Sequence, residues 1–136
     1  MNNIIKYTFI AIFILSLASC QKSKQTKILG TWVNQPMSNT TEVSGIEQLW
    51  TFDASSNLIV EETGSDTVIT YNGIYSMSSK NMGMSGYFVQ ITNVSSLLDG
   101  KYQIKELDES KLSLHRIELA DGSTTAAFLW REFIKK

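Results

Sequence analysis

Short runs in which apolar and polar residues alternate recur along most of the chain. In the run 101–105, for example, Tyr102 and Ile104 alternate with lysine and glutamine, and Leu112 and Leu114 alternate in the same way a few residues later. Strict alternation is typical of β-strands with one buried face, whereas a helix would repeat every 3.6 residues. Because long helical periodicity is absent from this part of the chain, the pattern predicts an all-β domain.

The alternating runs are separated by clusters of Gly, Ser, Asn and Asp, which favour tight turns. Most of these gaps are short enough for hairpins, so the pattern predicts an antiparallel meander of eight strands. Closing such a meander into an up-and-down barrel removes its exposed edges. The expected strands cover residues 28–34, 46–53, 57–62, 67–77, 87–94, 101–107, 111–117 and 124–133.

The same alternation predicts which side chains face the barrel interior. A shift of one residue would turn each apolar set to water, so the register of these strands is well specified. Trp130 is expected to face inward together with Phe128, and His115 is expected to face outward. If the barrel encloses a ligand, the residues expected to contact it are the inward aromatics Trp50, Phe52, Tyr71, Tyr75, Tyr102 and Phe128.

The N-terminal segment has a different pattern. Lys6 precedes an apolar stretch over residues 7–17, and the small residues Ala18 and Ser19 follow. This order is typical of a secretory signal peptide, and eleven apolar residues are too few to span a bilayer. Residues 1–19 are therefore predicted to be a signal peptide and are excluded from the fold prediction.

The single cysteine of the chain, Cys20, lies directly after this segment. The sequence Leu17-Ala18-Ser19-Cys20 resembles the lipobox of bacterial lipoproteins. This resemblance implies that the Cys20 thiol carries a diacylglyceryl group and that cleavage occurs just before it. Stable anchoring needs two or more acyl chains, which such a modification supplies. The alternative is an ordinary signal peptide followed by a chance cysteine.

Charge separates the rest of the chain into two parts. Residues 20–27 are predicted to be a lipidated tether with three lysines and no acid, while residues 28–136 form the barrel domain. The domain has 8 Lys and Arg residues against 13 Asp and Glu residues, a net charge of −5. A mildly acidic domain argues against nucleic acid as a partner. The basic tether suits a position beside anionic lipid headgroups.

A second resemblance covers the predicted barrel. The sequence Leu29-Gly30-Thr31-Trp32 is similar to the Gly-x-Trp start of lipocalins, and the whole domain resembles the short lipocalin-like domains of bacterial lipoproteins. The resemblance implies that Gly30 and Trp32 open the first strand and that a late arginine lies across Trp32. Arg131 is the candidate and Arg116 the alternative; with Phe128 and Trp130 inward, Arg131 would have to wrap around the rim.

Catalytic chemistry has few candidates in this sequence. The only histidine, His115, is expected on the outer face, and the only cysteine is expected to be acylated. Adjacent Glu61 and Glu62 face opposite sides of a strand, so they do not form a carboxylate pair by themselves. The sequence therefore predicts no enzyme, no metal site and no cofactor.

Two functions remain open at this stage. The first is a membrane-anchored module that binds a small hydrophobic or amphipathic ligand in the barrel, with the connection over residues 34–45 as a candidate lid. The second is a protein-interaction or inhibitor module whose barrel is filled by its own side chains. Because Gln21 replaces the aspartate that retains lipoproteins at the inner membrane, the lipoprotein resemblance implies an outer-membrane anchor facing the periplasm.

Overall fold

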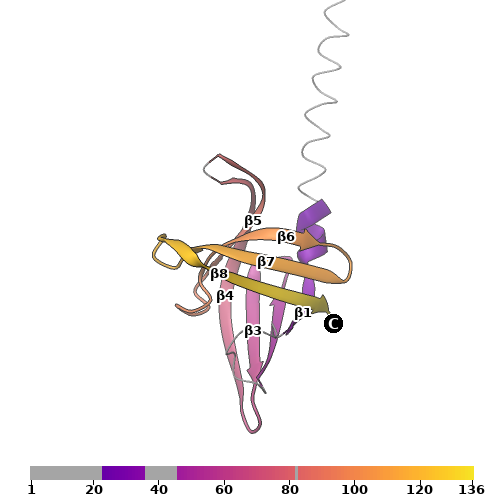
Figure 1. Cartoon of the computed structure of the whole chain (residues 1–136). Coiled ribbons are helices and arrows are strands. Elements are labelled where there is room, and N and C mark those ends of the chain that lie inside the picture. Colours follow the sequence, from indigo (N-terminus) through magenta and orange to yellow (C-terminus); the bar gives the residue numbers. More distant parts are fainter. Residues whose placement is uncertain (1–22, 36–45, 82) are drawn as a thin grey trace, which may run out of the picture.

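The computed structural model describes residues 23–35, 46–81 and 83–136. In this part of the chain eight antiparallel strands close into a barrel in which each strand pairs with its neighbours in sequence and the last pairs with the first. The predicted eight-stranded antiparallel up-and-down barrel is confirmed (Figure 1). The strands are β1 (Gly30–Gln35), β2 (Glu47–Phe52), β3 (Asn57–Thr63), β4 (Val68–Asn81), β5 (Met84–Thr92), β6 (Gly100–Leu107), β7 (Lys111–Leu119) and β8 (Thr124–Lys135).

Aspartates organise three of the hairpin turns, as the sequence pattern predicts. Asp53 Oδ1 accepts backbone N–H bonds from Ser55 and Asn57 at 2.8 Å. Asp108 binds the backbone of the β6–β7 turn in the same way, and Asp121 binds that of the β7–β8 turn. These bonds favour the charged carboxylate, so each of the three pKa values lies below its ordinary value.

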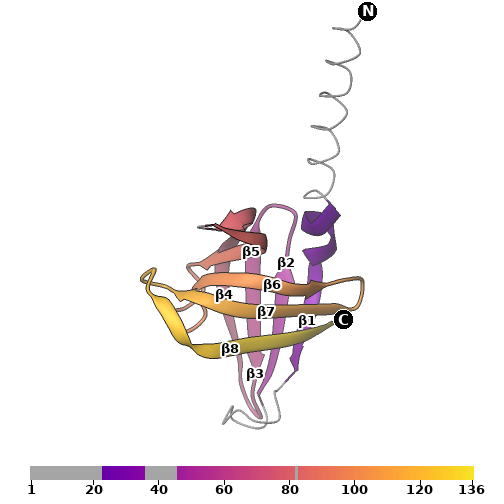
Figure 2. The same ribbon diagram turned by 45° about the horizontal axis from the view of Figure 1, so that its top comes forward.

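The strands form two layers that cross each other. In Figure 2, β6, β7 and β8 run across the front of the molecule while β1 to β4 run behind them. Pairing of Trp32 with Trp50 in β1–β2 and of Trp50 with Val60 in β2–β3 places these side chains on one inner face. All three are fully buried. The alternate apolar residues of these strands therefore form the core between the two layers.

Residues 23–28 differ from the prediction. They form a short helix at one end of the barrel instead of an extended tether, and β1 begins at Gly30 instead of residue 28 (Figure 1). Ile28 is fully buried in the core, which holds the helix against the barrel. The reason is the apolar side chain: burying one isoleucine contributes about 1.5–3 kcal/mol.

The predicted phase of the last strand was wrong. Phe133 is buried in the core, and Arg131 lies two residues earlier on the same face of β8. Trp130 instead stacks on the outward His115, with ring centroids 4.8 Å apart. The sequence misled because aromatic residues occur at both phases of this strand, so alternation does not distinguish them. The Phe128 side chain lies outside the described residues.

Candidate functional site

We call the end of the barrel where the helix over residues 23–28 packs the closed end, and the opposite end, where β3 leads into β4, the open end. Trp32 lies at the closed end, and its Nε1 donates a 2.7 Å hydrogen bond to the carbonyl of Ile28. Lys135 Nζ lies 4.9 Å from the centroid of the Trp32 ring, whereas Arg131 lies over Trp50. The expectation that Arg131 covers Trp32 is therefore corrected: β8 brings Lys135 opposite Trp32 in register, so the lysine covers the indole.

The predicted ligand-binding aromatics form a packed layer in the middle of the barrel. Trp50 lies 5.0 Å from Phe133 and 6.4 Å from Tyr102, measured between ring centroids. Phe52 and Tyr75 meet edge to face at 5.0 Å. Spacings in this range are those of aromatic pairs in close contact. Trp50, Phe52, Tyr75 and Tyr102 thus act as core side chains that contact one another, while Tyr71 is only half-buried.

A layer of polar side chains lies above the aromatic layer, toward the opposite end. Arg131 donates a hydrogen bond to Gln48 Oε1 at 3.2 Å, and Gln48 Nε2 donates to Glu62 at 2.6 Å. The guanidinium and the carboxylate are therefore bridged by one amide. Asn34 Oδ1 is buried without a hydrogen-bond partner in the described structure. We call the following residues the polar layer: Asn34, Gln48, Glu62, Tyr71 and Arg131.

Strand pairing explains how these five residues meet. Gln48 lies opposite Glu62 in the β2–β3 register, and it is two positions before Trp50 on the same face. Arg131 is likewise two residues from buried Phe133 in β8, and its guanidinium lies 5.6 Å from the Trp50 ring centroid. A cation in this position contributes about 0.5–2 kcal/mol and shields the ring from water. The polar layer therefore occupies the next inward-facing positions along the same strands that build the core.

Apolar side chains continue these faces beyond the polar layer but remain exposed. Ile69 lies opposite Glu62 in the β3–β4 register and is 49% exposed; Leu129 lies opposite Arg116 in β7–β8 and is 42% exposed. Ile46 comes two residues before Gln48 and is 48% exposed. Exposed large apolar groups in such an arrangement mark an interaction site more often than scattered single ones do. We call the apolar rim Ile46, Ile69 and Leu129, together with Leu97 of the connection over residues 93–99, which is 78% exposed.

The connection over residues 93–99 covers part of this open end. Leu98 is buried in the core, and its carbonyl accepts a 2.6 Å hydrogen bond from the Tyr102 hydroxyl. The buried Arg116 donates to the carbonyls of Leu97 and Asp99. Asp99 in turn accepts backbone N–H bonds at the start of the loop. Burial raises the pKa of Tyr102, and the positive charges of Arg131 and Arg116 oppose this rise.

Sequence reasoning did not bring the polar layer together: it named Tyr71 and Arg131 for other roles and did not single out Gln48. The notable signal was present: polar Gln48 and Glu62 stand at inward positions of strands whose other inward residues are apolar. A polar residue in an inward phase is informative because burying it unpaired is costly. The candidate lid over residues 34–45 lies largely outside the described residues, which resume at Ile46.

A groove lies at the other end of the molecule, between the short helix and β4. Its volume is about 270 Å³, and it is bordered by Gln25, Thr26, Leu29, Ala54, Ser56, Tyr75, Ser76 and Met77. None of these side chains is charged at neutral pH, and the Tyr75 hydroxyl already donates to the carbonyl of Asp53 at 2.7 Å. The open end, with its guanidinium, carboxylate and amides, therefore offers the stronger recognition chemistry.

No protein-family model, curated protein or solved structure matches this chain. In the part of the chain that the structure describes, no helix is long and apolar enough to cross a bilayer. Among the same residues, no three His, Cys, Asp or Glu side chains are grouped so that they could hold a metal ion. The class that the fold defines is an eight-stranded antiparallel barrel with a polar layer at its open end.

Proposed function

We propose that this chain is a lipid-anchored, non-enzymatic binding module of the bacterial cell envelope, and that a small amphipathic molecule binds at the open end of its barrel. The single observation that carries the proposal is the polar layer beneath an exposed apolar rim. Binding sites for small molecules commonly combine an apolar wall with a few convergent polar groups. The lipobox-like sequence ending at Cys20 supports the anchor, and Gln21 in place of a retention aspartate supports an outer-membrane position facing the periplasm.

The packed aromatic layer limits how deep such a ligand reaches. Because Trp50 packs against both Tyr102 and Phe133, a long acyl chain would have to displace a formed core. Separating packed core side chains costs several kcal/mol. The ligand therefore places a polar head on Arg131 and Gln48 and a short apolar part against the rim.

The charges of the polar layer indicate the head group. One guanidinium and one carboxylate, bridged by Gln48, favour a zwitterionic or neutral hydrogen-bonding head over a bare anion, which Glu62 would repel. Three amphiphiles of equal alkyl length test this: an alkyl sulfobetaine, an alkanoate and an alkylamine. Each is titrated while the tryptophan fluorescence is recorded, because Trp50 lies directly under Arg131.

We expect the sulfobetaine to bind most tightly. Arg131→Met should weaken it about 10- to 100-fold, the factor expected when a hydrogen bond to a charged group is lost. Lys101→Gln is the matched control, because Lys101 pairs with Glu118 outside the polar layer. If no amphiphile changes the fluorescence, or if both variants weaken binding equally, the proposal is overturned.

The second candidate function is an interaction or inhibitor module with a filled barrel. The packed aromatic layer favours it, because that layer needs no ligand to complete the core. In this case a protein partner would contact the apolar rim. Affinity capture from periplasmic extract, compared between the unchanged chain and Ile69→Asp, tests this function; capture that does not change with Ile69→Asp contradicts it.

A further inference from the structure

We infer that the closed end of the barrel is a docking face for an anionic lipid surface, and that the open end therefore points away from the membrane. This inference rests on the proposed lipid anchor for its geometry. It also has an independent basis in charge, because lysines from three separate parts of the chain meet at this end.

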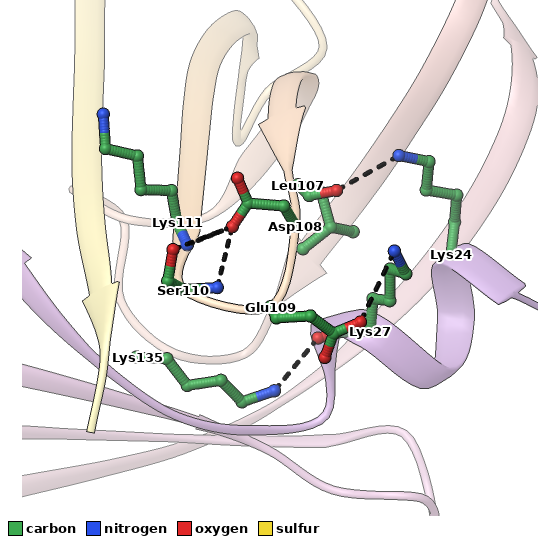
Figure 3. A network of polar contacts seen from close by, with 8 residues as sticks. All are labelled: Lys24, Lys27, Leu107, Asp108, Glu109, Ser110, Lys111 and Lys135. Atoms are coloured by element: carbon green, nitrogen blue, oxygen red, sulfur yellow. Dashed lines mark hydrogen bonds and ion pairs between the residues drawn. The ribbon is translucent and has the colours of Figure 1, made fainter.

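The helix is attached to the barrel by several contacts. Lys24 Nζ donates a 3.1 Å hydrogen bond to the carbonyl of Leu107, and Lys27 forms a 3.5 Å ion pair with Glu109 (Figure 3). Lys135 Nζ donates to the carbonyl of Lys27 at 3.3 Å. Helix, β6–β7 turn and the end of β8 thus form one connected surface.

This attachment shortens the link to the membrane. Three residue steps separate Cys20 from Ser23, the first residue of the helix, and three steps span at most about 10 Å. If residues 20–27 were all an extended tether, as the sequence suggested, the reach would be about 25 Å. A barrel held within about 10 Å of its anchor presents its helix-bearing end to the bilayer.

The charge at this end matches an anionic surface. Its cations are Lys24 and Lys27 of the helix, Lys111 after the β6–β7 turn, and Lys135 and Lys136 at the C-terminus; we call these five lysines the basic end. Its acids are Asp53, Glu106, Asp108 and Glu109, so the lysines exceed the acids by one. The carboxylates of Asp53 and Asp108 are bound by backbone N–H groups of their turns, and Glu109 pairs with Lys27.

The open end has the opposite charge balance. Glu47, Glu61, Glu62, Asp66, Asp99, Glu118 and Asp121 lie at or near its strand ends and connections, against Lys101, Arg116 and Arg131. Lys101 pairs with Glu118, and Arg116 binds loop carbonyls. A negatively charged membrane therefore attracts the basic end and repels the open end, and each lysine near such a surface strengthens binding about fivefold.

Two probes report the orientation of the mature lipidated chain in vesicles. Ser55, in the β2–β3 turn, marks the closed end, and Ser96, in the β5–β6 connection, marks the open end; both are exposed. Each is replaced by cysteine in a separate chain and labelled with a fluorophore, in vesicles that contain phosphatidylglycerol and a headgroup quencher. We expect quenching at Ser55→Cys and little at Ser96→Cys. Equal quenching, or stronger quenching at Ser96→Cys, overturns the inference.

A second measurement separates this inference from the anchor itself. Residues 30–135 supply every strand of the barrel, so a chain that starts at Gln21 keeps the whole sheet. This unacylated chain should sediment with phosphatidylglycerol vesicles at low salt but not with phosphatidylcholine vesicles. Lys111→Gln and Lys136→Gln should each weaken sedimentation about fivefold, and Lys101→Gln should not.

The outcomes distinguish the two proposals. Mass spectrometry of the mature chain tests acylation of Cys20, and an unmodified cysteine removes the proposed anchor while leaving the vesicle sedimentation as a test of the basic end. If the unacylated chain ignores anionic vesicles, or if Lys101→Gln weakens binding as much as Lys111→Gln, the basic end is not a lipid-binding face. That result would leave the anchor intact.

Discussion

Replacing Gly73 with alanine should be one of the most destabilising small changes in the barrel. Gly73 lies in β4 where the chain after β5 crosses close to it. A Cβ at this position would lie 2.6 Å from the carbonyl oxygen of Thr92 and 2.9 Å from the backbone nitrogen of Val94, and it would also meet the Val94 side chain. Two of these neighbours are backbone atoms, so no side-chain rotation relieves the contact.

The size of the effect follows from this geometry. Overpacking of a core costs about 1–3 kcal/mol, and backbone neighbours place Gly73→Ala near the upper value. For a domain of this size, about 3 kcal/mol corresponds to a fall in melting temperature on the order of 12 °C. The loss is a large fraction of the 5–15 kcal/mol that is typical of folded domains. Urea unfolding followed by tryptophan fluorescence measures it directly.

Gly64→Ala is the matched control. A Cβ at Gly64 would lie 3.6 Å from Thr67 Oγ1, which is an ordinary contact, and its backbone is not in the left-handed region. This variant should be neutral or more stable by about 0.4–1 kcal/mol, because alanine restricts the unfolded chain. If the free energy of unfolding of Gly73→Ala lies within about 0.5 kcal/mol of that of the unchanged protein, or if both variants lose the same stability, the proposed close approach between β4 and residues 92–94 is wrong.

Three further predictions concern buried groups near the two ends. Arg116→Met removes two hydrogen bonds to the connection over residues 93–99. It should lower the free energy of unfolding by about 2–4 kcal/mol and speed amide hydrogen exchange in that connection; unchanged exchange would contradict the role given to Arg116. Because the folded state raises the pKa of Tyr102, the contribution of this residue to stability should be constant below about pH 10 and fall as pH rises above it. Tyr102→Phe should lower the free energy of unfolding by about 1 kcal/mol at neutral pH but flatten this alkaline decline, and an equally steep decline would refute the assignment. Lys135→Met should lower the free energy of unfolding by about 1 kcal/mol because it removes the cation from the face of the Trp32 ring, and no loss in thermal unfolding would show that this cation does not stabilise the barrel.

Much of the fold could be predicted from local sequence. Alternation in residues such as Tyr102, Ile104, Leu112 and Leu114 depends only on the two-residue period of a strand, so it is readable without a structure. The turn aspartates act on backbone groups two to four residues away, which is also local. These features predicted eight strands in the right order with bounds close to those observed.

The candidate site was less predictable, because it depends on which strands become neighbours and at what register. Trp130 and Phe133 are both aromatic, so only pairing of β8 with β7 and β1 decides that Phe133 enters the core and that Arg131 follows it inward. The same register brings Lys135 instead of Arg131 to Trp32.

The sequence by itself therefore determined the strands, their turns and the closed meander, since each depends on local pattern; the lipid anchor at Cys20 stays a prediction. Only the tertiary structure decided that the inward aromatics pack on one another, that Gln48 bridges Arg131 and Glu62, and that residues 23–28 fold onto the barrel. The physical reason is distance along the chain. Contacts such as that between Gln48 and Arg131 join residues 83 positions apart, and no local periodicity specifies them.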